Sequence, residues 1–335
     1  PINPKKIALY VCGPTVYDDP HVGNGRALVV FDLLYRVLIE LFGKDKVTYV
    51  RNITDIDDKI IEASNKTKKS ISELTLDVTN NFHFDCKSLF CLKPSKEPKA
   101  TEHVDEMISM TKDLIKKGAA YENKGHVYFK VSSFKNYGKL SNKNLDELVS
   151  GARVKVSEFK KDPLDFVLWK PSLDKEPGWK SPWGRGRPGW HLECSVMSEK
   201  YLGKHFDIHG GGIDLKFPHH DCEIAQSESV YGNNPANYWI HTNMLTLNGK
   251  KMSKSLDNSV FPNEIFNGSN KEFSKKFSPM TLKFFMYQAH YRNTLDISNN
   301  ALLAAEKGFE KIKMLFEEIS TIHESEKNDF NAIEW

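Results

Sequence analysis

The hydrophobic positions near the start of the chain form two runs separated by a polar, glycine-bearing segment. Residues 7–11 are apolar throughout, and residues 27–42 are hydrophobic on almost every side. The first run predicts a buried strand and the second a buried helix. The segment between them is CGPTVYDDPHVGNGR, residues 12–26. Strand, glycine-bearing loop and helix in this order are typical of an α/β fold that points backbone N–H groups at phosphate. The glycine spacing matches neither the dinucleotide fingerprint nor the Walker P-loop.

A second short apolar run, residues 47–50, predicts another buried strand. It leads directly into the polar and acidic segment RNITDIDDKI, residues 51–60. Ligands of an open parallel sheet bind outside the carboxyl ends of its strands, so this segment is a candidate part of a binding site. It also has the pattern of a helix start, with Thr54 or Asp55 as the N-cap. The two interpretations are compatible.

The middle of the chain differs in composition from both ends. Residues 101–118 carry apolar side chains at helical spacing and end in glycine, which predicts a helix. A β-rich stretch follows at residues 127–131, and a loop-rich region with several prolines and tryptophans continues to Pro188. This shift indicates an insertion between the two halves of a sheet domain.

The pattern of strands and helices resumes after the inserted region. The segment GWHLEC, residues 189–194, opens a predicted helix that continues to about Leu202, and residues 239–241 predict a strand. From Ser278 the chain is predicted to be helical. An apolar stripe from Phe309 to Ile319 is expected to be core or a surface on which another domain packs.

The composition is that of an ordinary folded protein outside the membrane. With 335 residues, the chain is expected to contain two or three domains. Its net charge of +3 permits a nucleic-acid partner without arguing for one. No apolar run approaches the ~20 residues needed to span a bilayer, so we expect no membrane partner. Five cysteines in no regular framework indicate a reducing compartment, the cytoplasm, and thiols used as ligands.

Four residues in the two predicted halves carry donors that suit a metal ion. Cys12 and Cys194 are expected at the starts of helices, where the positive end of the helix dipole favours a thiolate. His219 and Glu223 are four residues apart and therefore share a helix face. Two sulfurs, a nitrogen and a carboxylate suit zinc. The spacing alone is a weak signal, because no CxxC pair is present and a buried cysteine is more often a small core residue.

Two neighbours of this set have open interpretations. Cys222 follows His219 by three residues, which makes its thiol a possible competing ligand. His220 is expected nearer to the opposite side of the helix, where it orients a neighbour or is exposed. Cys86 and Cys91 are interpreted as core residues.

Two elements far apart in the chain suit nucleotide chemistry when they are taken together. A His-x-Gly-x set begins at His21, and the basic sequence KMSKS occupies residues 251–255. Attack of a carboxylate on an α-phosphate builds charge on the phosphoryl oxygens and on the leaving pyrophosphate. An imidazole N–H on one side and ammonium groups on the other stabilise that charge as it develops. Residues 251–255 alone would be interpreted as a solvated basic loop.

The motifs closely resemble those of class I aminoacyl-tRNA synthetases and, among them, the cysteinyl-tRNA synthetases. The HIGH-like element is residues 21–24, and the KMSKS element is complete. Further matching phrases are YVCGPTVYD, RNITDIDDKI, GARV, DPLDFVLWK, GWHLECSVM, HGGGIDL, FPHH and EIAQSE. The resemblance extends from about Ile7 to the helices beyond Ser298, and the joint set is highly specific.

The resemblance implies roles for individual residues. Zinc held by Cys12, Cys194, His219 and Glu223 would receive the substrate thiol and reject serine without an editing domain. Cysteine would be surrounded by Cys12, Gly13, Thr54 and Trp190. The implied catalytic residues are His21, Asn24, Lys251 and Lys254. ATP, with Mg²⁺, would lie along His21, Gly23, Asn24, Gly210, Gly211, Gly212, Asp214 and Lys254, flanked by Trp239 and His241.

The sequence departs from the family pattern at several positions. Asn24 replaces the final histidine of the HIGH element, but an amide still donates a hydrogen bond, so activity is expected to survive. Asp221-Cys222 stands where the family more often has Glu-Asn. Thr242-Asn243 and Asp257 replace smaller residues, so the motion of the KMSKS loop is expected to differ. Family members usually continue beyond the position of Trp335 into an anticodon-binding domain.

The implied fold is a Rossmann-like α/β catalytic domain with an inserted connective domain, then a stem-contact segment and a C-terminal helical bundle. The expected division is 1–100 and 189–250 for the halves of the catalytic domain, 101–188 for the insertion, 251–285 for the KMSKS and stem-contact segment, and 286–335 for the bundle. The implied reaction activates L-cysteine with ATP to cysteinyl-adenylate, releases pyrophosphate, and transfers cysteine to the 3′ end of tRNA(Cys). We expect a monomer.

Two alternatives remain at this level. A sister ligase would form the same adenylate but transfer cysteine to a small amino-sugar thiol precursor. A non-catalytic tRNA- or nucleotide-binding module with a structural zinc would bind without turnover; the intact His21 and Lys254 speak against it.

Overall fold

A four-stranded parallel sheet lies at the centre of the structure, a computed structural model that describes residues 1–143, 158–252 and 258–321. Its strand order is β2-β1-β7-β8. The strands are β1 (Ile7–Val11), β2 (Val47–Arg51), β7 (Phe206–Gly212) and β8 (Ala236–Thr242). The whole of β1 is buried, as expected for a parallel strand covered on both faces.

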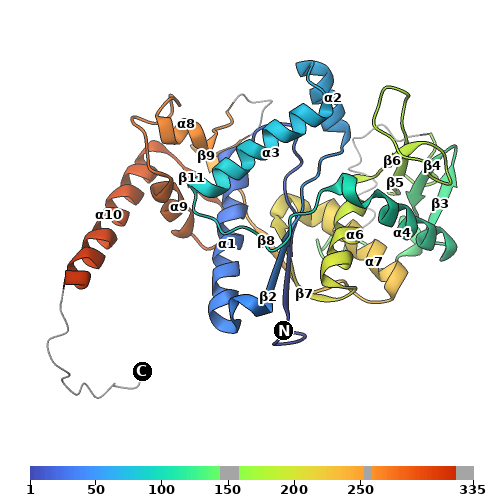
Figure 1. The fold of residues 1–335 in the computed structure, drawn as a ribbon, viewed down its shortest axis with the longest axis horizontal. Helices are drawn as coiled ribbons and strands as arrows, with labels where there is room; N and C mark the ends of the chain where they lie inside the picture. Colours follow the sequence, from blue (N-terminus) through green and yellow to red (C-terminus); the bar gives the residue numbers. More distant parts are fainter. Residues whose placement is uncertain (144–157, 253–257, 322–335) are drawn as a thin grey trace.

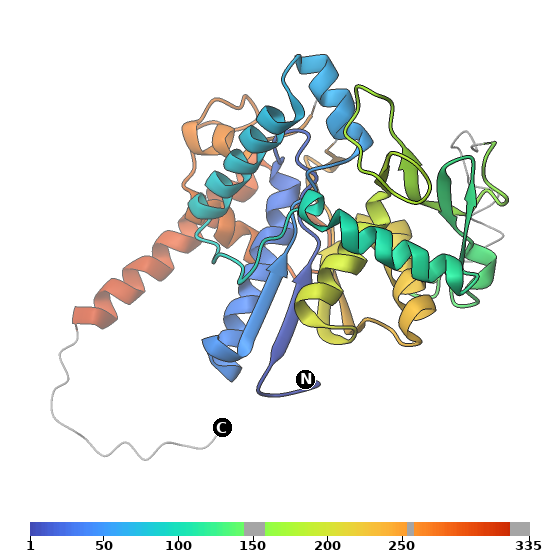
Figure 2. The ribbon, with the colours of Figure 1, turned by 45° about the vertical axis from the view of Figure 1, so that its right-hand side comes forward.

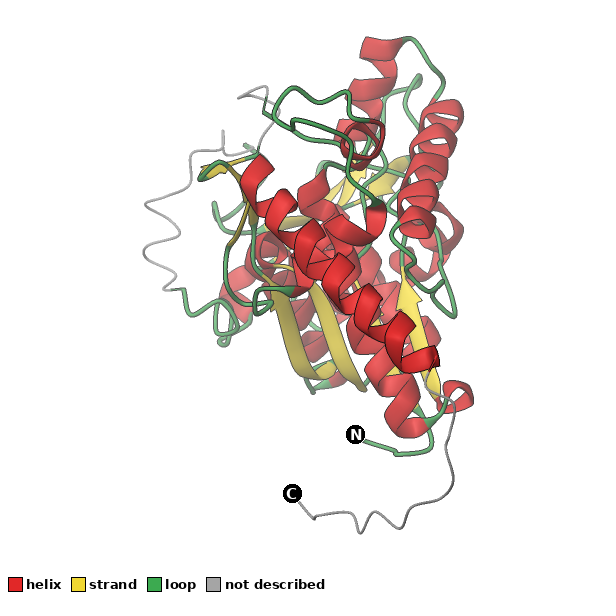
Figure 3. Ribbon diagram, turned by 90° about the vertical axis from the view of Figure 1, so that its left-hand side faces the viewer, coloured by secondary structure: helices red, strands yellow, loops and turns green. Residues whose placement is uncertain are grey.

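Helices cover both faces of this sheet because successive side chains of β1 point in opposite directions. Leu9 and Val11 pack with Phe31 of helix α1 (Val22–Phe42). Tyr10 belongs instead to the core formed with helices α4 (Val104–Lys116), α6 (Trp190–Leu202) and α7 (Asp221–Tyr231). Figure 2 shows β1 and β2 between α1 and α6, and Figure 3 shows the strands enclosed by helices.

The inserted region forms a separate antiparallel sheet. Its order is β3-β4-β5-β6, with β3 at Ala120–Asn123, β4 at His126–Phe129, β5 at Phe166–Pro171 and β6 at Gly186–Pro188. The buried side chains Phe129 and Trp169 of this sheet belong to the same core as Leu192 of α6. The insertion is therefore packed onto the parallel-sheet part of the molecule by a shared hydrophobic core, at the right of Figure 1.

A third, three-stranded sheet follows the parallel one. Its order is β10-β9-β11, with β9 at Leu245–Leu247, β10 at Lys250–Lys251 and β11 at Leu295–Ile297. Helices α8 (Pro262–Asn267), α9 (Pro279–Tyr287) and α10 (Asn299–Thr321) accompany it. The Lys283 ammonium of α9 lies 2.8 Å from the Asp32 carboxylate of α1, and both side chains are buried. This ion pair fixes the C-terminal part against the parallel sheet.

The remaining elements are short or peripheral. Helices α2 (Asp58–Thr67) and α3 (Ile71–Ser88) follow β2. The short helical turns are Lys44–Lys46, Ala100–His103, Val131–Ser133, Ile213–Leu215 and the π-type turn Lys216–His220. Within the described ranges, no helix combines the length and the apolar character needed to cross a membrane.

Several predicted boundaries need correction. Helix α1 begins at Val22, so it includes most of the HIGH-like element, and Leu33, Val37 and Leu41 are exposed; α1 is therefore not buried on every side. The N-cap after β2 is Asp57, whose carboxylate accepts from the Lys59 N–H, and neither Thr54 nor Asp55 takes that role.

Two helix predictions in the second half of the chain have different outcomes. The helix predicted from residue 189 to about 202 is confirmed by α6. The apolar stripe of α10 is not core in this structure, because Ile312, Leu315, Phe316 and Ile319 are exposed.

Candidate functional site

The four predicted metal-ligating residues come together at the carboxyl edge of the parallel sheet. Cys12 directly follows β1, whose last residue pairs with Gly210 of β7. Cys194 lies on α6, and Glu223 lies on the first turn of α7. The side-chain donor atoms of Cys12, Cys194, His219 and Glu223 all lie within 4.8 Å of one another.

The individual distances describe a compact group of donors. The Cys12 and Cys194 sulfurs are 3.6 Å apart, and the Cys12 thiol donates to Glu223 Oε1 at 3.6 Å. His219 Nε2 lies 3.2 Å from the same carboxylate oxygen. Such a set of two thiols, an imidazole and a carboxylate could hold a metal ion.

Cys12 and Cys194 are not at helix starts, which corrects the prediction. Cys12 lies ten positions before Val22, the first residue of α1, and Cys194 is the fifth residue of α6. A helix dipole acts within the first turn, so it does not stabilise either thiolate here. Burial instead raises the pKa of both thiols above the usual value.

Burial also lowers the pKa of His219 well below its usual value. The imidazole is therefore neutral and offers a lone pair to a metal. Among the described residues, the ion-pair partners of Glu223 are histidines, and no Lys or Arg side chain is paired with it. A bound metal ion would supply the positive charge that balances the Glu223 carboxylate and the lone pairs of the other buried donors.

A second ring of histidines surrounds this group. His209 Nε2 lies 2.8 Å from Glu223 Oε2, and His220 Nε2 lies 3.4 Å from the Cys12 sulfur. His220 Nδ1 is in turn 2.8 Å from His241 Nε2. The donors of Cys12, His209, His220 and Glu223 also lie within 4.8 Å of one another, so this ring orients two members of the first group.

The geometry bears on the open interpretations of Cys222 and His220. Cys222 is fully buried, its sulfur lies 3.3 Å from the Tyr137 hydroxyl, and it is absent from both described groups of donors. Its sulfur therefore contacts the inserted region, through Tyr137. His220 is likewise fully buried, so it is not an exposed residue, although it does contact neighbouring donors.

The residues predicted to surround the amino acid lie beside the metal group. Trp190 stacks on His219 with ring centroids 4.3 Å apart and planes inclined by 24°. The Thr54 hydroxyl donates to Glu193 Oε2 at 2.7 Å, and the Gly13 N–H donates to Asn52 Oδ1 at 2.9 Å. A Cβ atom at Gly13 would lie 1.6 Å from the Asn52 carbonyl oxygen, so only glycine allows the two strand ends to approach this closely.

Asn52, Glu193 and His209 are site residues that sequence reasoning did not single out. Glu193 is fully buried, and burial raises the pKa of its carboxyl group well above the usual value. A neutral Glu193 can donate one hydrogen bond of its own. The signal in the sequence was its place beside Cys194 in GWHLEC, where a polar residue lies among apolar ones.

The predicted nucleotide residues described by the structure come mainly from the start of α1 and the end of β7. His21 caps α1: its Nδ1 accepts from the Gly23 N–H at 3.1 Å. The Asn24 N–H donates to the His21 carbonyl at 2.9 Å. Gly210, Gly211 and Gly212 form the end of β7, and a Cβ at Gly210 would lie 2.2 Å from the Phe31 ring.

The KMSKS segment is described only in part. Lys251 ends β10 and is exposed, and Met252 is buried against the α1 side of the structure. Gly23 and Met252 lie close together, since a Cβ at Gly23 would lie 3.4 Å from the Met252 methyl group. Lys254 and Asp257 lie outside the described residues, as does the GARV phrase. Asp214, in the turn after β7, has its carboxylate near Gly212.

Comparisons with known proteins agree with this arrangement. The sequence profile described as "tRNA synthetases class I (C) catalytic domain" matches residues 1–307. A cysteine–tRNA ligase of Pelagibacter ubique is 54% identical over 303 residues, which are 90% of this chain and 65% of the relative. A cysteine–tRNA ligase of Methylocella silvestris is 52% identical over 308 residues, 92% of this chain and 68% of the relative.

A solved structure matches the fold. Methionyl-tRNA synthetase of Mycobacterium tuberculosis, in complex with methionyl-adenylate, superposes with a TM-score of 0.70 at 13% identity, covering 97% of this chain and 75% of that one. This chain spans about two thirds of the length of the curated relatives it matches.

Proposed function

The chain belongs to the class I (C) tRNA synthetases, and we propose that the protein is a cysteine–tRNA ligase. The observation that carries the proposal is the convergence of Cys12, Cys194, His219 and Glu223 within 4.8 Å, in a chain 54% identical to such a ligase. A metal site with thiolate ligands could bind the thiol of a cysteine substrate. It lies at the carboxyl edge of a parallel sheet, where such folds bind nucleotides, so the arrangement suits an enzyme that activates cysteine.

The proposed metal is zinc, held by the two thiolates, His219 Nε2 and Glu223. When bound, zinc supplies a Lewis acid that lowers the pKa of a substrate thiol and accepts the thiolate, for which a serine hydroxyl is a far poorer ligand. The protein's part is orientation. His209 holds one oxygen of Glu223, and Trp190 covers the His219 ring.

Thr54 and Gly13 are proposed to orient the backbone end of cysteine. The Thr54 hydroxyl donates to Glu193 and accepts from the Asn52 amide at 3.2 Å, which leaves one oxygen lone pair for the α-ammonium. The Gly13 N–H is already donated to Asn52, so we assign its carbonyl oxygen to the ammonium as well.

His21 is proposed to act on the phosphates of ATP. Because Nδ1 accepts from Gly23, the proton of the neutral ring is on Nε2, where it can donate to a phosphate oxygen. The cysteine carboxylate attacks the α-phosphorus and pyrophosphate leaves with the bonding electron pair. Charge then develops on groups that His21 on one side and Lys251 and Lys254 on the other can stabilise. Asn24 is assigned to the same phosphates, and Mg²⁺ accompanies ATP.

The adenosine is proposed to lie along Gly23, Gly210, Gly211, Gly212 and Asp214. The cysteinyl group then passes to the 3′ end of tRNA(Cys), which the insertion and the segment after residue 251 would contact. The division into catalytic halves, insertion, stem-contact segment and helical bundle belongs to the same proposal, as do the monomeric state and the cytoplasmic location.

The first test is cysteine-dependent exchange of pyrophosphate into ATP, with zinc per chain measured on the same samples. Wild type is expected to carry one zinc and to exchange. The Cys194→Ala variant is expected to lose both, whereas Cys86→Ala, a buried cysteine of α3 outside the cluster, is expected to keep both. Exchange that persists in zinc-free protein would overturn the metal mechanism.

Charging of tRNA separates the alternatives. The proposed ligase charges tRNA(Cys) with cysteine. A ligase for a small amino-sugar thiol precursor would exchange pyrophosphate but leave tRNA uncharged, and a binding module would do neither.

A further inference from the structure

Arg26 is a buried cation that the proposed mechanism does not use. It is the fifth residue of α1 and is fully buried. Its Nη1 donates to the Asn243 carbonyl at 3.1 Å and to the Met244 carbonyl at 2.7 Å. Its Nη2 donates to the His290 carbonyl at 3.2 Å, and its Nε is buried without a hydrogen-bond partner among the described residues. The described partners of this guanidinium are therefore backbone carbonyls and include no carboxylate.

A buried guanidinium without a carboxylate partner is costly to keep inside a protein. Moving a charge out of water costs free energy, and carbonyl dipoles offset that cost only in part. An apolar side chain of similar volume would fill the same place in α1 without this cost. What the guanidinium offers instead is a planar fork of N–H donors that reaches several carbonyls at once. The place of those carbonyls therefore indicates the role of Arg26.

The three carbonyls lie just before two neighbouring strands. Asn243 and Met244 form the junction between β8 and β9, and His290 precedes β11. Strands β9 and β11 are parallel and paired, so their starts lie at one edge of the three-stranded sheet. Arg26 therefore ties α1 to the edge at which the chain passes from the parallel sheet into the three-stranded one.

The three-stranded sheet carries Lys251. Strands β9 and β10 form an antiparallel hairpin in which Lys251 pairs with Thr246, two residues after Met244. Strand β9 also lies against α1 (Figure 1). Because the hairpin is short and its two strands are paired, a shift of the junction at its start is passed on to Lys251 at its end.

The first turn of α1 meets the same part of the chain at two further points. The Val22 N–H donates to the Val260 carbonyl at 2.7 Å. A Cβ atom at Gly23 would lie 3.4 Å from the Met252 methyl group. One of these contacts is a single backbone bond and the other is apolar. Arg26 adds three directional bonds one turn further along the helix, so it has the largest described share in fixing the orientation of the hairpin.

We propose that Arg26 is a positioning residue for the adenylate-forming step. By holding the junction between β8 and β9, it keeps the β9–β10 hairpin where Lys251 faces the ATP phosphates opposite His21. The proposal rests on the proposed function, which assigns those two side chains to the phosphates, and it adds the residue that sets their spacing. Because Arg26 is fully buried beneath carbonyls, it acts through Lys251 and not on the substrate.

The test is a double-mutant cycle on cysteine-dependent pyrophosphate exchange, with zinc per chain measured on each sample. Arg26→Met removes the fork of donors and keeps an unbranched apolar side chain. It is combined with Lys251→Ala, because a residue that acts through Lys251 should matter less once Lys251 is gone. The matched control is Lys283→Met. It also removes a buried cation that joins the C-terminal part to α1, but the described bonds of Lys283 go to Asp32 and the Phe90 carbonyl, outside the hairpin.

Arg26→Met is expected to lower the kcat of exchange by about 10- to 100-fold, as for a misplacement of about 1 Å near the reacting groups. The KM for cysteine and the zinc content should stay within about twofold of wild type, because the lost interaction is made in the transition state. In the Lys251→Ala background, the same substitution should lower kcat by less than about threefold. Lys283→Met should lower the urea midpoint, keep kcat within about threefold of wild type, and multiply with Lys251→Ala.

A milder variant covers the case in which Arg26→Met does not fold. Asn243→Ala keeps Arg26 but loosens the same junction. The Asn243 side chain donates to the Arg292 carbonyl at 2.8 Å and accepts from the Met244 N–H at 2.7 Å. Loss of these bonds should lower kcat by about 2- to 10-fold. That loss should also shrink in the Lys251→Ala background.

The outcomes separate the two proposals. Wild type that does not exchange pyrophosphate refutes the proposed function. A wild-type kcat in Lys251→Ala refutes the assignment of Lys251 to the phosphates, and the positioning role falls with it. Wild type that exchanges, with Arg26→Met and Asn243→Ala losses that multiply with Lys251→Ala, refutes the positioning role alone. An equal loss of kcat in Lys283→Met and Arg26→Met also refutes it, because any loosening of α1 would then have the same effect.

Discussion

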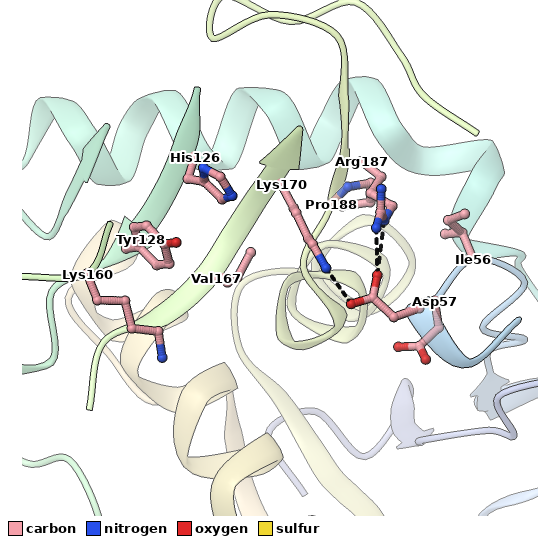
Figure 4. Close-up of a pocket in the computed structure, with 10 residues that line it drawn as sticks. Ile56, Asp57, His126, Tyr128, Lys160, Val167, Lys170, Arg187 and Pro188 are labelled. Carbon is pink, nitrogen blue, oxygen red and sulfur yellow. Dashed lines mark hydrogen bonds and ion pairs between the residues drawn. The ribbon is translucent and has the colours of Figure 1, made fainter. Parts of the chain in front are cut away.

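The metal group (Cys12, Cys194, His219 and Glu223) and the ion pairs of Asp58 with Lys170 and Arg187 differ in how their polar groups are satisfied. In the metal group, Cys194, His219 and Glu223 are at most 2% exposed, and burial keeps the thiols and the imidazole uncharged. In the cavity between the start of α2 and the inserted antiparallel sheet (Figure 4), the Asp58 side chain is 60% exposed. It is bonded to Lys170, which is 39% exposed, and to Arg187, which is only 6% exposed.

The difference bears on how each site responds to change. Buried metal-ligating side chains without a counter-charge depend on a bound cation that supplies it. Removing one of them, or the residue that orients it, is therefore expected to weaken binding of the cation strongly. Exposed ion pairs are compensated by water, so each contributes little alone.

The largest expected effect comes from disturbing the orientation of Glu223. His209→Ala removes the partner that holds Glu223 Oε2 at 2.8 Å. Loss of such a partner typically weakens metal affinity by about 10- to 100-fold. Competition with a chromophoric zinc chelator measures it. The control is His205→Ala, an exposed histidine just before β7 that contacts only the Asn234 carbonyl among its described bonds. Equal affinity in the two variants would contradict the orienting role.

The next largest effect is expected at Arg187, which is the least exposed of the three ion-paired side chains Asp58, Lys170 and Arg187. Its side chain is 6% exposed and joins Asp58 of α2 to Glu176 of the insertion. Arg187→Ala is expected to lower the free energy of unfolding by about 1.5–3 kcal/mol, the range for hydrogen bonds to charged groups. Urea unfolding measures the loss, and a double-mutant cycle with Asp58→Ala isolates the coupling. No coupling would mean that the pair does not fix the insertion.

Much of the metal group could be predicted from the sequence. The donor types of Cys12, Cys194, His219 and Glu223 suit a metal ion. His219, in the turn Lys216–His220, and Glu223, on α7, are only four residues apart. Their convergence with Cys12 follows from β1 lying next to β7 in a parallel sheet. The reason given for the thiols was nevertheless wrong, because the prediction placed helix starts where the structure has a strand end and a helix interior.

The partners of the ligands were harder to predict. His209 lies inside β7, where periodicity suggests only a strand residue, and its contact with Glu223 joins two elements. Asp58 and Arg187 are 129 residues apart with no motif to connect them, and only the packing of the insertion brings them together. Lys254 is outside the described residues, so its role stays a prediction.

Substitution of Cys222 tests whether the metal site includes a third cysteine. Cys222→Ala removes a fully buried sulfur that contacts Tyr137, so we expect the free energy of unfolding to fall by about 1 kcal/mol. Zinc content and exchange should not change, because Cys222 belongs to neither described donor group. Zinc content below one per chain in this variant, with wild-type helicity by circular dichroism, would restore Cys222 as a ligand.

The smallest expected effect is at Lys170, the exposed counterpart of Arg187 on the same carboxylate. Its side chain is 39% exposed and lies 2.6 Å from Asp58, so Lys170→Ala should cost only about 0.2–1 kcal/mol. Raising the salt concentration toward about 1 M, where the screening length is about 3 Å, should remove most of that cost. The cost of Arg187→Ala should persist in salt, because its side chain is buried. Urea unfolding of both variants at low and high salt makes the comparison. If Lys170→Ala proved as costly and as salt-resistant as Arg187→Ala, the cavity would be a buried ionic core, and the contrast with the metal group would not hold.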